Sequence, residues 1–354
     1  MRPEFWRNKR VLLTGHTGFK GSWLSLWLQH WGAQVTGLSL APTSQPNLFE
    51  AAEVASGLRS EIGDVRDLAF VERVVTTAQP EIVLHLAAQA LVRRSYRDPL
   101  TTYTTNVLGT VHVLDAVRRL GRAQAVVVVT SDKCYENREW VWPYREDEAM
   151  GGPDPYSSSK GCAELVVSAY RKSYFTRLGI GLASARAGNV IGGGDWSEDR
   201  LIADLVRGFS SGSSVLIRAP RAIRPWQHVL DALSGYLLLA ERLHADPARY
   251  AEGWNFGPTS EDAVEVGPIA DRMVARWGKD ANWTADKDAG PHEAHLLKLD
   301  ASKARGLLGW RPRLALDVAL DWIVDWHKAQ VRGEDMRALT LRQLEHYHAL
   351  GRDT

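Results

Sequence analysis

The chain has 354 residues, with 43 basic and 42 acidic side chains and a hydrophobic content of 45%. This length and apolar content are sufficient for a large core and two lobes. A net charge of +1 gives no support for a nucleic-acid or membrane-surface partner. Two cysteines, Cys134 and Cys162, are too few for a disulfide framework or a metal cluster. No apolar run approaches the roughly 20 residues of a membrane span, and the N-terminus lacks an apolar signal core, so we expect a cytoplasmic protein without a metal.

Apolar runs alternate with helical patterns over the first half of the chain. Long apolar runs fit strands that are covered on both faces, and short connections favour right-handed crossovers. The pattern therefore predicts an α/β fold with a Rossmann-type, doubly wound parallel sheet. The expected strands are 11–15, 34–40, 81–88, 125–131 and 180–190, and the expected helices between them include 70–78 and 107–121.

Beyond residue 190 the pattern changes. Segments rich in Gly, Ser and Pro, such as GGGDWSED and RAPRAIRPW, predict a smaller, loop-rich mixed α/β lobe that binds the substrate. We expect a dinucleotide-binding domain over 1–187, to which the chain returns around 226–258, and a substrate lobe mainly over 188–354.

Three glycines, Gly15, Gly18 and Gly21, follow the first strand and precede the amphipathic segment SWLSLWLQHW. Glycines let the backbone approach a pyrophosphate, and the free N–H groups at the start of a helix point at it. The spacing is GxxGxxG, the version associated with short-chain dehydrogenase/reductases, rather than GxGxxG. A tight strand-to-helix turn with no ligand is the alternative.

Ligands of an open α/β sheet bind at the carboxyl ends of its strands. Asp64, in Gly63-Asp64-Val65, could hold the exocyclic amine of an adenine, or it could cap a helix. Ala87 and Ala88 are small enough for a dinucleotide to lie close. Ser39 stands where an acid would bind a ribose hydroxyl, so the motif leaves NAD and NADP open.

Tyr156 and Lys160 form a YxxxK motif at the start of a helix that follows PDP. Positions i and i+4 share a helix face, so the ammonium can lie near the phenol. A neighbouring cation lowers the pKa of a tyrosine, which would give a phenolate able to remove a proton from an alcohol. The pattern gains weight from the N-terminal glycines and from a strand that ends in Thr130-Ser131.

With these motifs the chain resembles the extended short-chain dehydrogenase/reductase family of nucleotide-sugar enzymes over essentially its whole length, and within it the CDP-glucose 4,6-dehydratase branch. Dehydratases of this family carry Asp-Glu after the Ser or Thr of the active-site strand. Here the residues are Ser131-Asp132-Lys133, and lysine in place of glutamate is typical of the CDP-glucose branch. The matching stretches are GHTGFKGSWLSLWL, HLAAQALVRRSY, TNVLGT, TSDKCYEN, PYSSSKGCAE, RAGNVIGGGDWSEDR, AIRPWQHVL and LDASKARGLLGWRP.

The resemblance implies an NAD-dependent hydro-lyase of deoxysugar and lipopolysaccharide O-antigen synthesis. It would oxidise C4 of CDP-glucose, eliminate water across C5 and C6, and return the hydride to C6. The expected catalytic residues are Ser131, Asp132, Lys133, Tyr156 and Lys160. The expected NAD contacts are Gly15, Thr17, Gly18, Phe19, Lys20, Gly21, Asp64, Val65, Leu86, Ala87, Ala88, Thr105, Tyr156 and Lys160, and the expected substrate contacts are Gln89, Asn189, Arg224 and His292.

Asp132 as acid and Lys133 as base present an electrostatic conflict. A protonated lysine beside Asp132 would lower the pKa of the carboxyl and make it a poor acid. The pair works only where desolvation favours a neutral carboxyl with a neutral amine, and it should titrate as one unit. A surface Asp and Lys that close a strand are the alternative.

Other functions remain open. The chain could be a 4,6-dehydratase or 4-epimerase of a dTDP-, GDP- or UDP-linked hexose, or a dinucleotide-binding regulator without catalysis, because fold does not imply function. Tyr156 and Lys160 are both present, which argues against the regulator. Apolar faces of the helices after TNVLGT and from Tyr156 onward predict a homodimer or a dimer of dimers.

Overall fold

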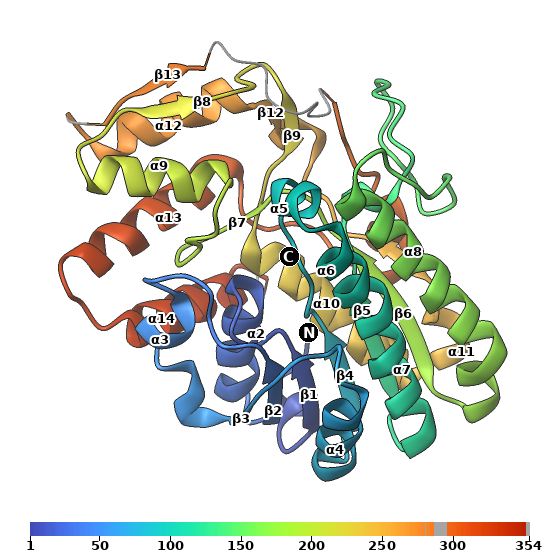
Figure 1. The fold of residues 1–354 in the computed structure, drawn as a ribbon. Helices are drawn as coiled ribbons and strands as arrows, with labels where there is room; N and C mark the ends of the chain where they lie inside the picture. The colour runs from blue at the N-terminus through green and yellow to red at the C-terminus, as the bar shows by residue number, and fades with distance from the viewer. Residues whose placement is uncertain (280, 287–295, 352–354) are drawn as a thin grey trace.

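The computed structural model describes residues 1–279, 281–286 and 296–351. Its centre is a seven-stranded sheet with the order β11-β6-β5-β4-β1-β2-β3, in which every pair of neighbours is parallel (Figure 1). This arrangement confirms the predicted doubly wound sheet. The strands are β1 (Arg10–Thr14), β2 (Gln34–Ser39), β3 (Arg59–Ile62), β4 (Ile82–His85), β5 (Ala125–Val129), β6 (Gly181–Arg186) and β11 (Gly253–Asn255).

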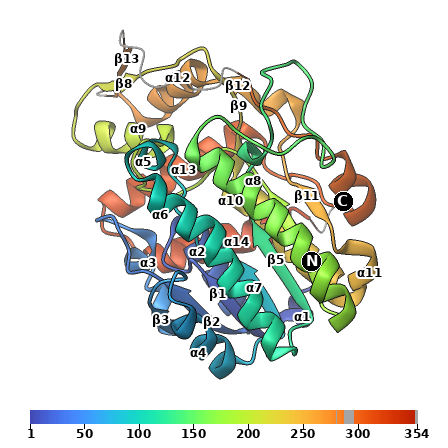
Figure 2. The same ribbon diagram turned by 45° about the vertical axis from the view of Figure 1, so that its right-hand side comes forward.

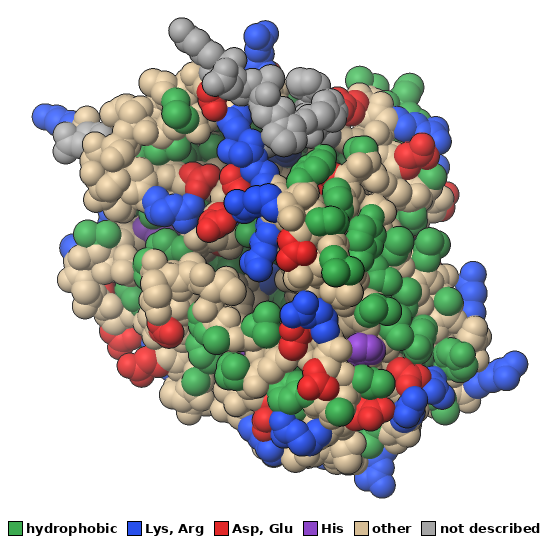
Figure 3. Space-filling model, viewed as in Figure 1, with side chains coloured by type: hydrophobic (Ala, Val, Ile, Leu, Met, Phe, Trp, Pro, Cys, Tyr) green, Lys and Arg blue, Asp and Glu red, His purple; other side chains and the backbone are tan. Residues whose placement is uncertain are grey.

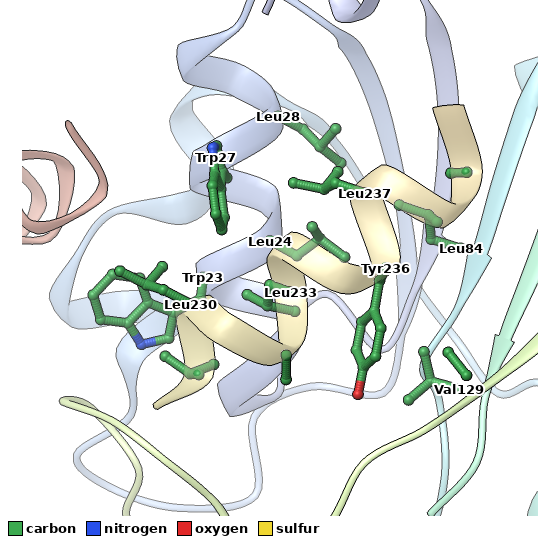
Figure 4. Close-up of a cluster of buried hydrophobic side chains, with 14 of the residues drawn as sticks. Trp23, Leu24, Trp27, Leu28, Leu84, Val129, Leu230, Leu233, Tyr236 and Leu237 are labelled. Carbon is green, nitrogen blue, oxygen red and sulfur yellow. The ribbon is translucent and has the colours of Figure 1, made fainter. Parts of the chain in front are cut away.

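Helices cover both faces of the sheet, and alternate strand residues pack against each layer. Leu13 and Val127 belong to the core under one layer, whereas Leu12 and Val126 belong to the core under the other. Figure 4 shows α2 and α10 interlocking in the first core, and Figure 2 shows α7 and α8 side by side on the opposite face. The first layer holds α2 (Phe19–His30), α10 (Val229–Ala245) and α14 (Met336–Ala349), and the second holds α4 (Leu68–Ala78), α7 (Gly109–Leu120) and α8 (Pro155–Tyr170).

The helix predicted to begin at residue 107 begins earlier. The α6 helix (Pro99–Tyr103) continues through one π-helical turn, η2 (Thr104–Leu108), into α7. The Asp98 side chain caps α6 by accepting a hydrogen bond from the Thr101 N–H at 3.0 Å. Proline at the first helical position and an aspartate cap are a standard helix start, and this start lies outside the apolar periodicity used for the prediction.

The second lobe contains more helix than the predicted loop-rich lobe. Its core joins α9 (Leu201–Ser210), α12 (Val266–Trp277) and α13 (Leu316–Val331). The Gly-, Ser- and Pro-rich stretches are the connections between these amphipathic helices. Short strand pairs complete the lobe: β7 (Val190–Ile191) with β10 (Gln227–His228), β8 (Val215–Ile217) with β13 (Trp283–Ala285), and β9 (Ile223–Pro225) with β12 (Ala263–Glu265).

The chain crosses between the lobes more than once. After β10 it runs through α10 to β11, which pairs with β6 in the central sheet. The C-terminal α14 lies against the first lobe, where the Tyr347 hydroxyl donates to Asp231 Oδ1 of α10 at 2.7 Å. The division of the chain near residue 187 stays a prediction. The remaining short elements are α1 (Pro3–Trp6), α3 (Leu48–Ala51), η1 (Val54–Gly57), α5 (Val92–Arg97), η3 (Asp132–Cys134), η4 (Arg171–Phe175), η5 (Thr176–Leu178), α11 (Pro247–Tyr250), η6 (Ser260–Asp262) and η7 (Ala304–Leu308).

Within the described residues, no helix combines the length and the apolar character that crossing a bilayer requires. The expected cytoplasmic location stays a prediction.

Candidate active site

A cavity of about 880 Å³ lies between the two lobes. The carboxyl ends of β1, β2, β4 and β5 form one side of it, and the segments after β6 and around β8 and β9 form the other. Figure 3 shows Lys, Arg, Asp and Glu side chains gathered where the lobes meet. Every predicted site residue that the structure describes lines this cavity, whereas His292 lies outside the described residues.

The glycine turn brings backbone rather than side chains to the cavity. A Cβ on Gly21 would stand 1.9 Å from the Gly15 carbonyl oxygen, so α2 can approach β1 only with glycine there. Gly18 is the N-cap of α2 and has no side-chain cap, and a Cβ on it would meet only the Gly15 oxygen, at 3.4 Å. The first N–H groups of a helix lack intrahelical partners, so this turn offers donors to an anion.

The end of β2 presents hydroxyl groups where an acid was expected. The Thr17 hydroxyl lies 2.8 Å from the Ser39 hydroxyl and also donates to the Leu40 carbonyl at 2.8 Å. The cavity-lining residues that follow, Leu40 to Ser44, Asn47 and Leu48, carry no charge. These residues after β2 therefore supply neither an acid for a ribose hydroxyl nor a base for a 2′-phosphate.

Asp64 does not cap a helix. Asp67 is the N-cap of α4 and accepts from the Phe70 N–H at 3.1 Å, so the helix-cap alternative for Asp64 is wrong. The Asp64 carboxylate instead accepts from the backbone and the guanidinium of Arg66, at 2.6–2.8 Å. Its proposed contact with an adenine stays a prediction.

The turn after β5 presents Ser131, Asp132 and Lys133. Asp132 is buried, with 1% of its surface exposed. Its Oδ1 accepts from the Ser131 hydroxyl at 2.9 Å and lies 3.7 Å from the Lys133 ammonium. Its Oδ2 has no hydrogen-bond partner among the described residues, and a Cβ on Gly188 would stand 2.0 Å from it. Gly188, which the sequence analysis missed, therefore makes room for the carboxylate.

Helix α8 presents Tyr156 and Lys160 to the same region. The helix starts where Asp154 accepts from the Ser157 N–H at 2.9 Å and proline occupies the first position. Both Tyr156 and Lys160 are buried, and the Tyr156 phenol is close enough to Ser131 for that side chain to affect its pKa. The oxidation and elimination candidates therefore meet around Ser131.

The predicted direction of the Tyr156 pKa is wrong for the protein alone. Burial raises the pKa of the phenol to about 12, although the neighbouring Ser131 side chain lowers it in part. The Lys160 ammonium, which donates to the Val129 carbonyl at 3.3 Å, is not among the main groups that shift this pKa. Burial also lowers the pKa of Lys160 to about 8, since desolvation penalises both phenolate and ammonium. Spacing on a helix carries no information about this penalty.

Lys20 and Tyr236 add a second polar pair. The Lys20 ammonium lies 3.5 Å from the Tyr236 hydroxyl, which comes from α10; in Figure 4 this hydroxyl points away from the α2–α10 contact. Burial, with repulsion from Arg200 and Lys160, lowers the pKa of Lys20 to about 7. Nothing local in the sequence marks Tyr236, which lies in the segment 226–258 where the chain was predicted to return to the first domain.

The predicted substrate contacts that the structure describes differ in how far their polar groups are already used in hydrogen bonds within the protein. Gln89 uses its amide internally, donating to Thr102 Oγ1 at 3.0 Å and to the Leu91 carbonyl at 3.1 Å. Asn189 lines the cavity with a strained backbone φ of 33°. The Arg224 guanidinium lines it too and donates to the Ile223 carbonyl at 3.0 Å.

A family model described as GDP-mannose 4,6 dehydratase matches residues 12–321. The chain belongs to the GDP-mannose 4,6 dehydratase family. Within the wider set of relatives, the CDP-glucose 4,6-dehydratase of Salmonella typhimurium is 56% identical over 349 residues, which cover 97% of each chain. Membership of the GDP-mannose 4,6 dehydratase family makes this chain a sugar-nucleotide 4,6-dehydratase, an enzyme of the hydro-lyase class, as predicted.

Solved structures of other proteins share the fold of this chain. A UDP-glucose 4-epimerase with UDP-glucose from Thermotoga maritima is 23% identical with a TM-score of 0.78, covering 91% of this chain and 99% of its own. MoeE5 in complex with UDP-glucuronic acid and NAD is 25% identical with a TM-score of 0.78, covering 90% of this chain and 99% of its own. The predicted Rossmann-type fold is confirmed.

Proposed function

We propose that this enzyme converts CDP-glucose to CDP-4-keto-6-deoxyglucose and water with NAD as a recycled cofactor. One observation carries the proposal: a single cavity brings Tyr156 and Ser131 next to a buried Asp132 paired with Lys133. Oxidation needs a base for a hydroxyl proton, and elimination needs a second acid–base pair close by. The 56% identity to a CDP-glucose 4,6-dehydratase supports the choice of nucleotide.

The residues at the sheet edge fit NAD. Gly15, Gly18 and Gly21 leave backbone open to the cavity, and Ala87 and Ala88 line it without bulk. The lack of charge after Ser39 is compatible with a ribose that carries hydroxyls only. NAD supplies a hydride acceptor for C4 and, once reduced, the donor for C6.

Tyr156 takes the proton of the glucose 4-hydroxyl while C4 loses its hydride, which leaves a C4 ketone. Ser131 is a neighbouring side chain that favours the phenolate. Because burial raises the pKa of this phenol to about 12, the protein alone keeps Tyr156 protonated at neutral pH. A positive charge held beside Tyr156 would favour its phenolate.

The ketone acidifies the C5 proton, and Lys133 removes it as the base of the elimination. Asp132 protonates the departing C6 hydroxyl, which leaves as water. After hydride has reached C6, the C5 carbon regains a proton from Lys133, whose side chain is 30% exposed and can exchange protons with solvent. Over one turnover Tyr156 gains one proton and Asp132 loses one. Proton exchange with solvent therefore returns both side chains to their starting states.

Product analysis with CDP-, dTDP-, UDP- and GDP-linked hexoses tests the proposal. We expect CDP-glucose to lose one water and the other substrates to turn over at least tenfold more slowly. A product of unchanged mass would indicate a 4-epimerase. Faster dehydration of another nucleotide sugar would show that CDP-glucose is not the preferred substrate. No turnover of any of them would favour the regulator.

We also propose that the enzyme is a homodimer or a dimer of dimers. Exposed apolar side chains gather on neighbouring helices of the second layer, and Figure 3 shows them where α6 and α8 lie in Figure 1. Leu100 is 74% exposed and Leu165 is 62% exposed. A single exposed apolar side chain is ordinary, but a group of them on neighbouring helices indicates a contact surface for another protein. Sedimentation at micromolar concentration should give a dimer or tetramer, and a monomer would contradict this.

A further inference from the structure

A buried ion pair lies directly below the catalytic residues. Glu164 follows Lys160 by one helical turn and Tyr156 by two, so it occupies the same face of α8. Its carboxylate lies 2.7 Å from the guanidinium of Arg186 on β6, and both side chains are 5% exposed. Neither residue was singled out by the sequence motifs.

Glu164 binds the residue before the catalytic turn. The Thr130 hydroxyl donates to Glu164 Oε1 at 2.5 Å, and the Ser184 hydroxyl donates to Oε2 at 2.7 Å. Thr130 immediately precedes Ser131 in the chain. Lys160 contributes the neighbouring contact, with its ammonium on the Val129 carbonyl.

Arg186 binds the residue after the catalytic turn. Its Nη1 donates to the Tyr135 hydroxyl at 2.7 Å and to the Glu146 carbonyl at 3.0 Å. The Tyr135 hydroxyl in turn donates to Asn255 Oδ1 at 2.7 Å. Tyr135 immediately follows η3, the turn that contains Asp132 and Lys133.

Close packing between α8 and this turn makes their spacing sensitive to small shifts. A Cβ on Gly161, the residue after Lys160, would stand 3.2 Å from the Cys134 carbonyl oxygen. A buried ion pair adds little stability compared with apolar residues of similar volume, because desolvation offsets its attraction. Its hydrogen bonds are directional, however, so it holds one arrangement of the elements that it joins.

We propose that the Glu164–Arg186 ion pair is the positioning element that sets the distance between the Tyr156 and Lys160 face of α8 and the Ser131–Lys133 turn. Glu164 holds the turn from the Thr130 side, and Arg186 holds it from the Tyr135 side. Oxidation and elimination thereby share one geometry around the sugar. The inference rests on the proposed function, because it requires both sets of residues to take part in the reaction.

The test uses substitutions that remove one hydroxyl and keep both charges. Thr130→Val and Tyr135→Phe each delete one hydrogen bond to the pair. We expect kcat for dehydration to fall about tenfold in each holoenzyme, while KM for CDP-glucose changes less than twofold. Because Tyr135 anchors the side of the turn next to Lys133, Tyr135→Phe should slow elimination more than oxidation and build up reduced nicotinamide absorbance during turnover.

Tyr347→Phe is the matched control. It removes a buried tyrosine hydroxyl that is hydrogen-bonded to Asp231 and Ser234, away from the turn. We expect it to lower Tm by as much as Tyr135→Phe and to leave kcat unchanged. Equal losses of kcat in the control and in Tyr135→Phe would show that lost stability alone explains the effect, and would overturn the proposal.

The wild-type enzyme separates the two possible failures. If it dehydrates CDP-glucose and both variants keep its kcat, the positioning role fails and the proposed function stands. If the wild type dehydrates no sugar nucleotide, the proposed function fails and the positioning role fails with it.

Discussion

The cofactor edge of the sheet and the catalytic turn are built in different ways. At the cofactor edge, Gly15, Gly18, Gly21, Ala87 and Ala88 reach the cavity as backbone or small side chains, beside the larger Phe19, Lys20 and Leu86. The segment 130–160 reaches it with buried ionisable groups, including Asp132, Tyr156 and Lys160. The first region depends on shape, which a glycine pattern encodes locally. The second depends on desolvation and on partners from other elements, so its chemistry emerges only in three dimensions.

The largest expected effect is in the catalytic region. Tyr156→Phe removes the base for the 4-hydroxyl and should reduce kcat by about a hundredfold or more. Binding of CDP-glucose, measured by calorimetry, should change little, because the phenyl ring keeps its packing. Tyr170→Phe on the same helix should leave kcat unchanged, and near-normal turnover of Tyr156→Phe would remove its assigned role.

Substitutions in the Ser131–Lys133 turn should separate the two half-reactions. Asp132→Asn and Lys133→Met should slow dehydration by about ten- to a hundredfold, within or below the range of acid–base catalysis. C4 oxidation should survive, so bound reduced nicotinamide should accumulate, whereas Tyr156→Phe should form none. Absorbance during a single turnover measures this, and normal dehydration by either variant would contradict the assignment.

The cofactor edge should respond in affinity rather than in chemistry. Gly21→Ala places a Cβ 1.9 Å from the Gly15 oxygen, which must push α2 away from β1. We expect NAD affinity to fall at least tenfold, about 1.4 kcal/mol, with kcat largely restored at saturating NAD. Gly306→Ala, where a Cβ meets no atom within 4 Å, is the control. An unchanged Kd in Gly21→Ala would show that the glycine turn does not shape the cofactor site.

An effect on stability rather than on activity should come from His85, which lies between the two regions. Its Nδ1 lies 2.7 Å from the Thr14 hydroxyl, and burial lowers its pKa to about 3. Below the ordinary histidine pKa of about 6.5, this histidine binds a proton in the unfolded chain, whereas in the folded protein it stays neutral. Stability should therefore fall by about 1.4 kcal/mol per pH unit from this residue as pH drops from 6.5 towards 3. Urea unfolding of wild type and His85→Gln between pH 7.5 and 5 should show a shallower slope in the variant; equal slopes would contradict the neutral histidine.

The same contrast explains what could be predicted from the sequence. Gly15, Gly18 and Gly21, like Tyr156 and Lys160, are local patterns with fixed spacing, and all of them line one cavity. The direction of the Tyr156 pKa was predicted wrongly, because the burial that raises it comes from surrounding elements. Gly188, Tyr236 and the Glu164–Arg186 pair were missed because their partners lie far away in the chain. A hint existed for Glu164, which continues the i, i+4 spacing after Lys160.

Isotope transfer tests the central claim most directly. The account requires one enzyme to oxidise C4, eliminate water across C5 and C6, and reduce C6 with the same hydride. CDP-glucose carrying deuterium at C4 should therefore give a product with deuterium at C6, and turnover in heavy water should place solvent deuterium at C5. If the C4 label is lost to solvent or remains at C4, the proposed division of work between Tyr156 and the Asp132–Lys133 pair is contradicted.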